Sequence, residues 1–240
     1  MAYMSVVIPC YNESLSIPIV FQKALYITSN YDIEFIFLDN GSNDDTWNIM
    51  QDLNSKKQIK CLRIEENKGY GFGIKFALKY AKGNYIGWTH ADLQTDLFDI
   101  IKAYQKIKQA ELRKNNQNLY AIKGIRFGRK LSDVFISYAM SSLMRILFFP
   151  WKTYEINAQP SLYHFSILSY LDKSPDDYSF DIYAYLLSFY LKFQQLRFPV
   201  LFPSRIYGKS HWNIDVLSKL VFIRKTLSFI LKMFFKFKKF

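Results

Sequence analysis

The sequence is poor in cysteine and lacks a long apolar segment without charge. Its 240 residues include two cysteines, Cys10 and Cys61, too few for a disulfide framework or a cysteine-rich zinc module and typical of a reducing compartment. We expect no signal peptide, because the first apolar run, 6–8, is short and ends at Pro9. No window of about 20 residues is both apolar and uncharged, so we predict no transmembrane helix.

Acidic residues are scarce relative to basic ones. The 20 Asp and Glu stand against 32 Lys and Arg, which gives a net charge of +12. This balance favours an anionic partner: a nucleotide, a phosphate, a nucleic acid or a membrane surface. Residues 205–240 hold nine basic residues and one acid, or +8 of the total. Half of the residues are hydrophobic, enough for a substantial core.

The chain alternates short apolar runs with helical patterns, and this predicts a mostly parallel sheet. We predict strands at 4–8, 33–38, 59–64, 85–88, 120–125 and 196–202, and helices at 17–25, from 44, and at 73–81, 99–111, 132–148 and 182–193. In such sheets ligands bind beyond the carboxyl ends of the strands. Polar clusters at 9–13, 39–42 and 89–94 follow three of these strands, so we expect them to meet in one pocket.

Four ordered motifs resemble those of glycosyltransferase family 2. The segment 6–13, VVIPCYNE, resembles the opening motif of that family, and 39–46, DNGSNDDT, resembles its D-x-x-S-x-D-x-T turn. The glycines of 67–73 resemble the segment before the metal motif. The sequence HADLQ at 90–94 stands where dolichol- and polyprenyl-phosphate sugar transferases carry D-A-D-L-Q. Phe180-Asp181 and RIYGKS at 205–210 resemble later elements of that branch.

The resemblance covers about residues 3–213 and implies the GT-A fold, an α/β, Rossmann-like, mostly parallel sheet flanked by helices. We expect an amphipathic helical tail to follow this fold. The implied domains are a single unit over 1–212, with a nucleotide-binding half at 1–118 and an acceptor half at 119–212, and a basic membrane-associating tail at 213–240.

A nucleotide-sugar donor requires charge neutralisation at its diphosphate, which a divalent cation, Mn²⁺ or Mg²⁺, supplies as a Lewis acid. We predict Asp92 as the metal carboxylate and a catalytic residue, with Gln94 either supporting it at the metal or contacting phosphate. The alternative role of Asp92 is the cap of the helix that follows. His90 replaces the first carboxylate of the usual D-x-D. It is either a metal ligand, better suited to manganese than to magnesium, or a hydrogen-bond donor to sugar or phosphate.

The strand-end clusters would hold the nucleotide. We expect Asp39 and Glu13 to accept hydrogen bonds from the base or ribose; the alternative is ordinary turn chemistry. The predicted nucleotide-binding set is Pro9, Tyr11, Asn12, Glu13, Asp39, Asn40, Gly41, Ala91 and Asp92. The glycines at 69, 71 and 73 do not have dinucleotide-fingerprint spacing, so we reject an oxidoreductase; they allow close backbone approach or tight turns.

Basic residues of the second half are expected to bind the donor and acceptor phosphates, or else to form a solvated basic face. The basic residues are Lys123, Arg126, Arg129, Arg205 and Lys209. The polar Ser210, next to Lys209, is included in the same predicted set. The segment 155–160, EINAQP, matches poorly the D-x-x-x-G-F element of the polyprenyl-phosphate branch. A phosphate acceptor needs no base, whereas a sugar hydroxyl does, and the candidate base is Asp181. Asp181 has two alternative roles, orienting the acceptor or capping its helix.

The tail repeats apolar residues at helical spacing, with basic residues opposite. The apolar face comprises Val216, Leu220, Ile223, Leu227, Ile230, Leu231 and Phe234; Lys225, Ser228, Lys232 and Lys236 lie opposite. This pattern predicts an interfacial helix on anionic lipid, with packing on the protein's own core as the alternative. A nucleic-acid patch would leave the strand-end clusters unexplained, so we predict no nucleic-acid partner.

We therefore predict an inverting, metal-dependent hexosyltransferase, peripheral at the cytoplasmic face of a membrane. Its donor would be a UDP- or GDP-sugar, and its acceptor a polyprenyl or dolichyl phosphate. The first alternative acceptor is a hydroxyl of a lipid-linked or surface saccharide. The second alternative, suggested by His90, is a nucleotide-sugar-binding protein without catalytic activity.

Overall fold

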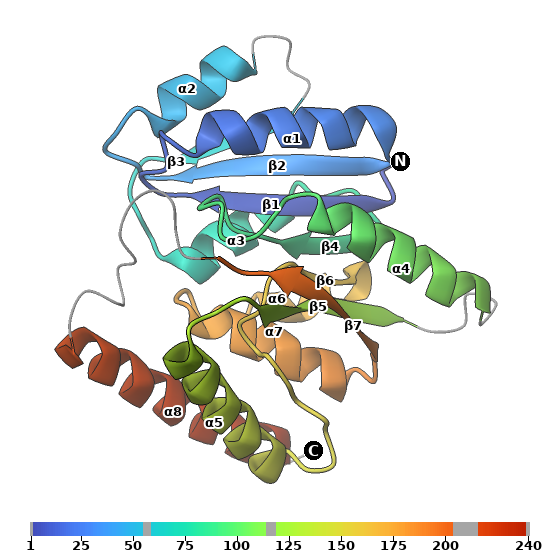
Figure 1. Cartoon of the computed structure of the whole chain (residues 1–240), viewed down its shortest axis with the longest axis vertical. Coiled ribbons are helices and arrows are strands. Elements are labelled where there is room, and N and C mark those ends of the chain that lie inside the picture. The colour runs from blue at the N-terminus through green and yellow to red at the C-terminus, as the bar shows by residue number, and fades with distance from the viewer. Residues whose placement is uncertain (1, 55–58, 114–118, 204–215, 239–240) are drawn as a thin grey trace.

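A seven-stranded sheet in the order β3-β2-β1-β4-β6-β5-β7 forms the centre of the molecule (Figure 1). The computed structural model describes residues 2–54, 59–113, 119–203 and 216–238. Neighbouring strands are parallel except at β6, which is antiparallel to both β4 and β5. The strands are β1 (Met4–Cys10), β2 (Ile33–Asn40), β3 (Lys60–Ile64), β4 (Tyr85–Trp88), β5 (Tyr120–Phe127), β6 (Ser161–His164) and β7 (Gln194–Leu201).

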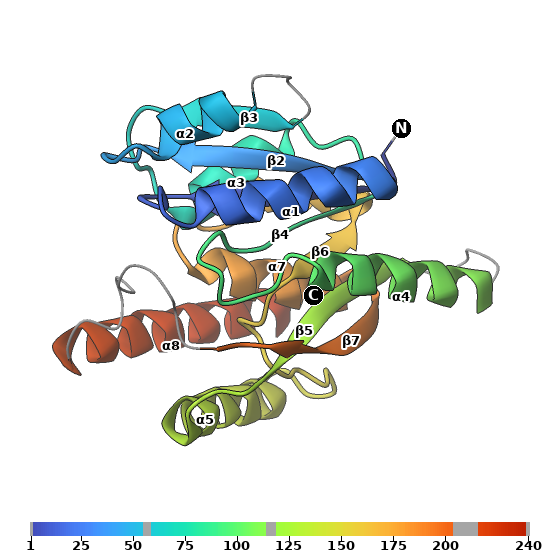
Figure 2. The same cartoon turned by 45° about the horizontal axis from the view of Figure 1, so that its top comes forward.

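Helices cover both faces of this sheet (Figure 2). On one face lie α1 (Ile17–Asn30), α2 (Thr46–Leu53) and α4 (Asp99–Arg113); on the other lie α3 (Tyr70–Leu78) and α7 (Ser179–Tyr190), with α5 (Leu131–Leu147) and α8 (Val216–Lys238) at one end. The short η1 (Phe165–Ile167) and α6 (Leu168–Leu171) follow β6. Val6 and Ile8 enter one core and Val7 the other, because successive side chains of a strand alternate between faces. The unbroken apolar run in β1 thus reflects a strand buried on both sides.

Helix α3 begins at Tyr70, three residues before its predicted start. Gly71 and Gly73 therefore lie inside the helix, where we expected a turn or a close approach. A Cβ at Gly71 would lie 2.4 Å from the carbonyl oxygen of Pro175. Close backbone approach is thus the reason for this glycine.

The tail forms α8 as predicted, but two apolar side chains in its described part are buried by the protein itself. Ile230 and Met233 are 0% and 3% exposed and join the same core as α7. Phe237 contacts the ring of Tyr190 at a centroid distance of 5.5 Å. The alternative of packing on the protein's own core therefore describes residues 226–237 of this helix. Among the residues that the structure describes, none of the helices has the length and hydropathy required to span a bilayer.

Candidate active site

Three strand-end loops lie at one edge of the sheet, as the sequence predicts. The strands β2, β1 and β4 are neighbours and parallel, so their carboxyl ends share this edge. The loops after β1, β2 and β4 carry Glu13, Gly41 and Asp92, while Asp39 and Asn40 are the last two residues of β2 itself. The order of the sheet thus places the chemically distinctive residues of the first half on the same edge.

The loops after β1 and β2 are bonded to one another. The backbone N–H of Asn12 donates to Ser42 Oγ at 3.0 Å, and the N–H of Asn43 donates back to Asn12 Oδ1 at 2.9 Å. The N–H of Glu13 donates to Thr46 Oγ1 at 2.8 Å. Asn12 adopts φ 56°, a left-handed conformation that asparagine tolerates better than most residues. These contacts make the two loops one structural unit.

Asp39 is fully buried within this unit. Its Oδ1 accepts a hydrogen bond from the N–H of Ser42 at 3.0 Å, and its Oδ2 lies 3.5 Å from Arg63 Nε. Among the described residues, Oδ2 has no hydrogen-bond partner. Gly41 follows at φ 76°, and a Cβ there would lie 2.4 Å from the backbone nitrogen of Asn67. The turn therefore requires glycine and holds an oriented carboxylate oxygen that can accept a hydrogen bond.

Asp92 is 6% exposed in the loop after β4. Its Oδ1 accepts a hydrogen bond from the N–H of Gln94 at 3.0 Å, while Gln94 Nε2 donates to the carbonyl of Pro203 at 3.2 Å. Asp96 Oδ1 accepts from the N–H of Phe98 in the turn that precedes α4. Asp96 rather than Asp92 thus bonds the turn before this helix, so the capping alternative for Asp92 is wrong.

Asp181, in the first turn of α7, is held by three donors from three other segments. Trp88 Nε1 donates to its Oδ1 at 2.6 Å; Gln159 Nε2 and the hydroxyl of Tyr70 donate to its Oδ2 at 3.2 and 3.3 Å. The ring of Tyr70 lies 5.9 Å from that of His90. Tyr70 therefore lies between Asp181 and His90 of the HADLQ loop. The Asp181 carboxylate accepts its hydrogen bonds from Trp88, Gln159 and Tyr70, so it does not act as a helix cap.

Tyr70 itself is partly buried and stacks on Tyr178 at a centroid distance of 5.0 Å. Burial, and then the nearby carboxylate of Asp181, raise the pKa of the Tyr70 hydroxyl well above its usual value. This hydroxyl therefore stays protonated and donates to Asp181. It links α3 and α7 at the end of β4.

Lys123, predicted to contact phosphate, is instead buried in the sheet. Its exposed fraction is 1%, and its ammonium donates to the hydroxyl of Ser161 on the neighbouring strand β6. Burial lowers the pKa of Lys123 to about 7, although Asp181 acts in the opposite direction. This side chain has a protein partner and does not reach the surface.

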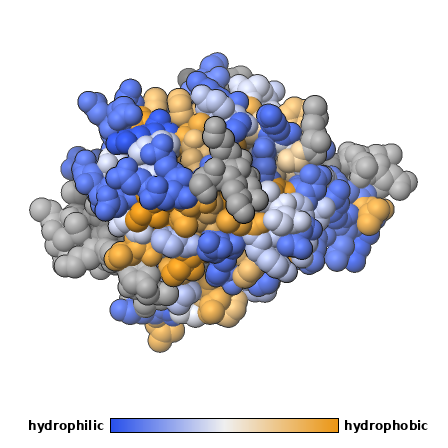
Figure 3. Space-filling view, turned by 90° about the horizontal axis from the view of Figure 1, so that it is seen from above, coloured by the Kyte–Doolittle hydropathy of each residue, from blue (hydrophilic) through white to orange (hydrophobic). Residues whose placement is uncertain are grey.

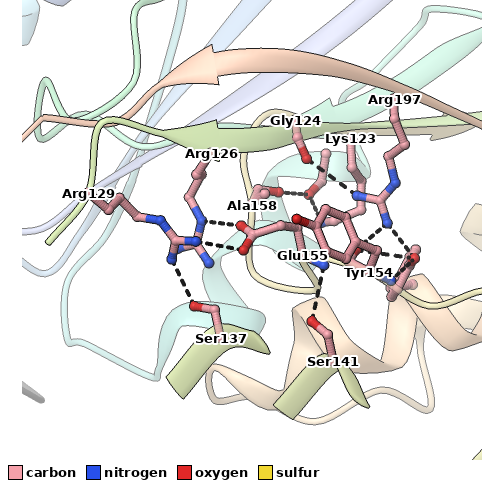
Figure 4. Close-up of polar contacts among 12 residues, drawn as sticks. Lys123, Gly124, Arg126, Arg129, Ser137, Ser141, Tyr154, Glu155, Ala158 and Arg197 are labelled. Carbon is pink, nitrogen blue, oxygen red and sulfur yellow. Dashed lines mark hydrogen bonds and ion pairs between the residues drawn. The ribbon is translucent and has the colours of Figure 1, made fainter. Parts of the chain in front are cut away.

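Arg126 and Arg129 at the end of β5 both bind Glu155 (Figure 4). Arg126 Nε lies 2.7 Å from Glu155 Oε2, and an Nη atom of Arg129 lies 2.7 Å from Oε1. Arg129 also donates to Ser137 on α5 at 2.8 Å, and the N–H of Glu155 donates to Ser141 at 3.3 Å. The two arginine side chains are 13% and 7% exposed, so a solvated basic face does not describe them. The cluster has a net charge of +1.

Residues 205–210 lie outside the described residues, so the predicted contacts of Arg205, Lys209 and Ser210 remain predictions. The sequence interpretation missed Trp88, Tyr70, Gln159 and the pairing of Glu155. Only Trp88 carries a detectable signal, since a buried indole N–H at the end of a strand needs an acceptor. Tyr70 and Gln159 come close to Asp181 only through tertiary packing.

The donor set suits a cation that is shared with a bound diphosphate. Within the described ranges, no three His, Cys, Asp or Glu side chains are close enough to form a protein-only metal site. Asp92 supplies one nearly buried carboxylate, and His90 stands two residues before it. Magnesium is commonly held by one or two carboxylates together with phosphate oxygens and water. The residues present therefore fit such a shared ion.

A surface cavity of about 510 Å³ lies elsewhere, between α3 and α6. Lys75, Lys79, Phe165 and Leu168 are among the residues that line it, and none of the predicted site residues does. The predicted site is thus an assembly of loops at the sheet edge, distinct from this cavity.

Comparison with known proteins identifies the family. The model of glycosyl transferase family 2 matches residues 5–172, so this chain belongs to that family. A dolichol-phosphate mannosyltransferase from Pyrococcus furiosus is 31% identical over 105 residues, which is 44% of this chain and 30% of that protein. A dolichyl-phosphate beta-glucosyltransferase from Dictyostelium discoideum is 27% identical over 107 residues, covering 40% of this chain and 33% of that protein. The matched region thus spans about a third of these relatives.

Solved structures agree on the fold. Glucosyl-3-phosphoglycerate synthase from Mycobacterium tuberculosis, in complex with Mn²⁺, UDP-glucose and phosphoglyceric acid, superposes with a TM-score of 0.68 at 16% identity, covering 95% of this chain and 80% of that one. A mannosyltransferase from Pyrobaculum calidifontis in complex with GDP-mannose and Mn²⁺ gives 0.61 at 16% identity, covering 87% and 58%. The α/β architecture predicted from the sequence is therefore confirmed.

Proposed function

We propose that this chain is an inverting hexosyltransferase that moves a sugar from a UDP- or GDP-sugar to a polyprenyl or dolichyl phosphate. The observation that carries the proposal is the placement of three strand-end loops at one sheet edge, with Asp39 at the end of β2 and Asp92 after β4, the two strands that flank β1. Relatives named as dolichol- and dolichyl-phosphate sugar transferases support the acceptor class. We also propose that the enzyme works as a peripheral protein at the cytoplasmic face of a membrane.

In this proposal the nucleoside lies against the first two loops. Asp39 Oδ2, a buried oxygen without a hydrogen-bond partner in the described part of the chain, accepts a hydrogen bond from the base or ribose. Glu13 follows on the same bonded unit, and Pro9 and Tyr11 supply surfaces for the base. Gly41 keeps the turn close enough for this contact.

Asp92 would hold the divalent cation, with His90 as a second ligand or as a donor to phosphate. When bound, the cation neutralises the charge that develops on the departing diphosphate. The hydrogen bond from the Gln94 N–H to Asp92 fixes the carboxylate before the donor arrives, which reduces the cost of ordering it.

The acceptor phosphate would approach Arg126 and Arg129. Their pairing with Glu155 supports this role, because two guanidinium groups that converge on a carboxylate have the geometry that also suits a phosphate. Arg205, Lys209 and Ser210 stay in the proposal as further phosphate contacts. Lys123 does not, because it is buried.

A specific observation favours a second acceptor, a sugar hydroxyl. Asp181 is a nearly buried carboxylate that three donors hold beside the His90 loop, an arrangement suited to a general base. Replacing Asp181 by Asn tests this point. With a phosphate acceptor we expect turnover within about tenfold of wild type, since phosphate is already anionic; loss beyond about 100-fold would indicate a base and a hydroxyl acceptor.

The activity itself is tested with a panel of nucleotide-sugars, Mn²⁺ or Mg²⁺, and a short-chain polyprenyl phosphate, measuring release of nucleoside diphosphate. Asp92→Ala should abolish release. Asp96→Ala is the matched control, because Asp96 lies in the same loop but is half-exposed and pairs with Lys23. A robustly active enzyme that is indifferent to Asp92→Ala and to chelator would overturn the metal role. Binding of nucleotide-sugar without release would favour the non-catalytic alternative.

A further inference from the structure

Helix α5 carries apolar side chains on two opposite sides. Met144, on its inward side, is fully buried in the core that α7 and α8 share. On the outward side Leu131, Phe135, Tyr138 and Ile146 are 87%, 73%, 60% and 76% exposed. Their spacing of four, three and eight residues places them on one face of a helix. A helix of a globular domain that is apolar on both sides is ordinarily covered on both.

The same end of the molecule exposes further aromatic side chains. Phe149, just beyond α5, is 84% exposed, and Phe235 on α8 is 64% exposed. The end of α5 contacts α8 here, since the ring of Phe148, directly after α5, lies 6.1 Å from that of Phe234. The face of the molecule over α2, seen from above, instead carries hydrophilic and apolar residues side by side (Figure 3). Exposed apolar surface of this extent marks an interaction site.

The charges around this surface are predominantly basic. Among residues 130–152 and 224–237 the single acid is Asp133. Seven basic residues stand in the same ranges, all of them exposed: Lys130, Arg145, Lys152, Arg224, Lys225, Lys232 and Lys236. Two copies of such a surface would repel each other, whereas an anionic lipid surface attracts it. An apolar helix face bordered by lysine and arginine is the pattern of an interfacial helix.

We propose that the outward face of α5, rather than the tail alone, inserts into the surface of an anionic phospholipid bilayer. The inference rests on the proposed membrane association and identifies the segment that makes it. Because Arg129 donates to Ser137 on α5, and shares Glu155 with Arg126, this docking places the proposed acceptor site at the depth of the lipid headgroups. The tail contributes basic charge, since Ile230 and Met233 in its described part are already buried in the core.

The test is flotation of the full chain with phosphatidylcholine vesicles that contain or lack phosphatidylglycerol. The double variant Phe135→Ser, Ile146→Ser should lose about tenfold or more in partitioning to the anionic vesicles. The control Tyr26→Ser, Leu112→Ser removes two side chains that are 55% and 80% exposed on α1 and α4, and should stay within about twofold of wild type. Circular dichroism checks that each variant is folded. Wild-type binding should fall without phosphatidylglycerol.

Equal binding of the double variant and wild type would overturn the role of α5. Wild-type protein that ignores vesicles but sediments as a dimer, dissociated by the double variant, would also overturn it and assign the face to a second copy. Nucleoside diphosphate release with a water-soluble acceptor, without vesicles, separates the two proposals. Vesicle binding through α5 by a chain without turnover would leave this inference standing and overturn the proposed function alone.

Discussion

The indole nitrogen of Trp88 lies 2.6 Å from Asp181 Oδ1 and joins two residues that are 93 positions apart in sequence. Trp88 ends β4 with its side chain fully buried, so its N–H requires a partner inside the protein. Asp181 supplies the acceptor from the first turn of α7. This bond sets the position of the carboxylate relative to the sheet edge that carries His90 and Asp92.

Replacing Trp88 by Phe removes this donor while keeping an aromatic ring in the core. With a hydroxyl acceptor, which requires Asp181 as a base, we expect kcat to fall about tenfold with little change in KM for the nucleotide-sugar, because Asp181 loses its fixed position but the nucleoside contacts remain. Steady-state kinetics measures both constants. Trp151→Phe, a like change near the far end of the molecule, should leave kcat unaltered. An unchanged kcat in Trp88→Phe would show that Asp181 needs no such positioning.

The buried Lys123 gives stability a dependence on pH. Its pKa is lowered by burial to about 7 in the folded chain, against about 10.4 when unfolded, so between these values the unfolded chain binds more protons. Stability should therefore rise with pH, by about 2 kcal/mol between pH 7 and 9. In Lys123→Met this rise should disappear, as urea denaturation at pH 7, 8 and 9 can measure. Lys106→Met, an exposed control on α4, should keep the wild-type slope.

Glu155 neutralises one of two neighbouring arginine charges. In Glu155→Gln both guanidinium groups stay nearly buried without their carboxylate, and the free energy of unfolding should fall by about 3 kcal/mol. Urea denaturation provides the measurement. The control is Glu65→Gln, where a side chain that is 82% exposed lies 3.6 Å from Arg63, and we expect a change below about 0.5 kcal/mol. Equal effects at both positions would rule out a special role for the cluster.

Two adjacent residues of α8, one buried and one exposed, test whether this helix packs on the rest of the protein. Ile230→Ala empties a fully buried position and should reduce the free energy of unfolding by about 3 kcal/mol. Leu231→Ala alters a side chain that is 48% exposed, so its effect should be small, below about 1 kcal/mol. Thermal unfolding of the two variants makes the comparison. If Ile230→Ala is as harmless as Leu231→Ala, α8 does not pack on α7 in solution.

The strands β1, β2 and β4 could be predicted because they are buried on both faces. Residues 35–38 are apolar without alternation, and the structure extends the predicted strand 33–38 by only two residues, to Asn40. Their polar ends could be predicted too, since parallel strands share one carboxyl edge. The loops at Glu13, Asp39 and Asp92 therefore fall where the sequence placed them.

Other features depend on contacts that have no local signal. Strand β6 has four residues and exists through its pairing with β4 and β5, so no periodicity reveals it. The pairing of Arg126 and Arg129 with Glu155 joins residues 29 and 26 positions apart, with α5 between them in the chain. The burial of Lys123 likewise follows from β5 lying inside the sheet, whereas its charge alone suggested a surface ligand.

The reversed direction of β6 has a consequence for how this architecture can vary. Because β6 runs against β5, the chain that leaves the end of β5 enters β6 from the same side of the sheet. The stretch 128–160, which includes α5 and Glu155, is thus one continuous connection at a single edge of the sheet. Lengthening or replacing this connection changes the surface at that edge of the sheet, while strands β1 to β4 keep their neighbours. Changes within one continuous segment can therefore alter what binds at this edge without changing the sheet.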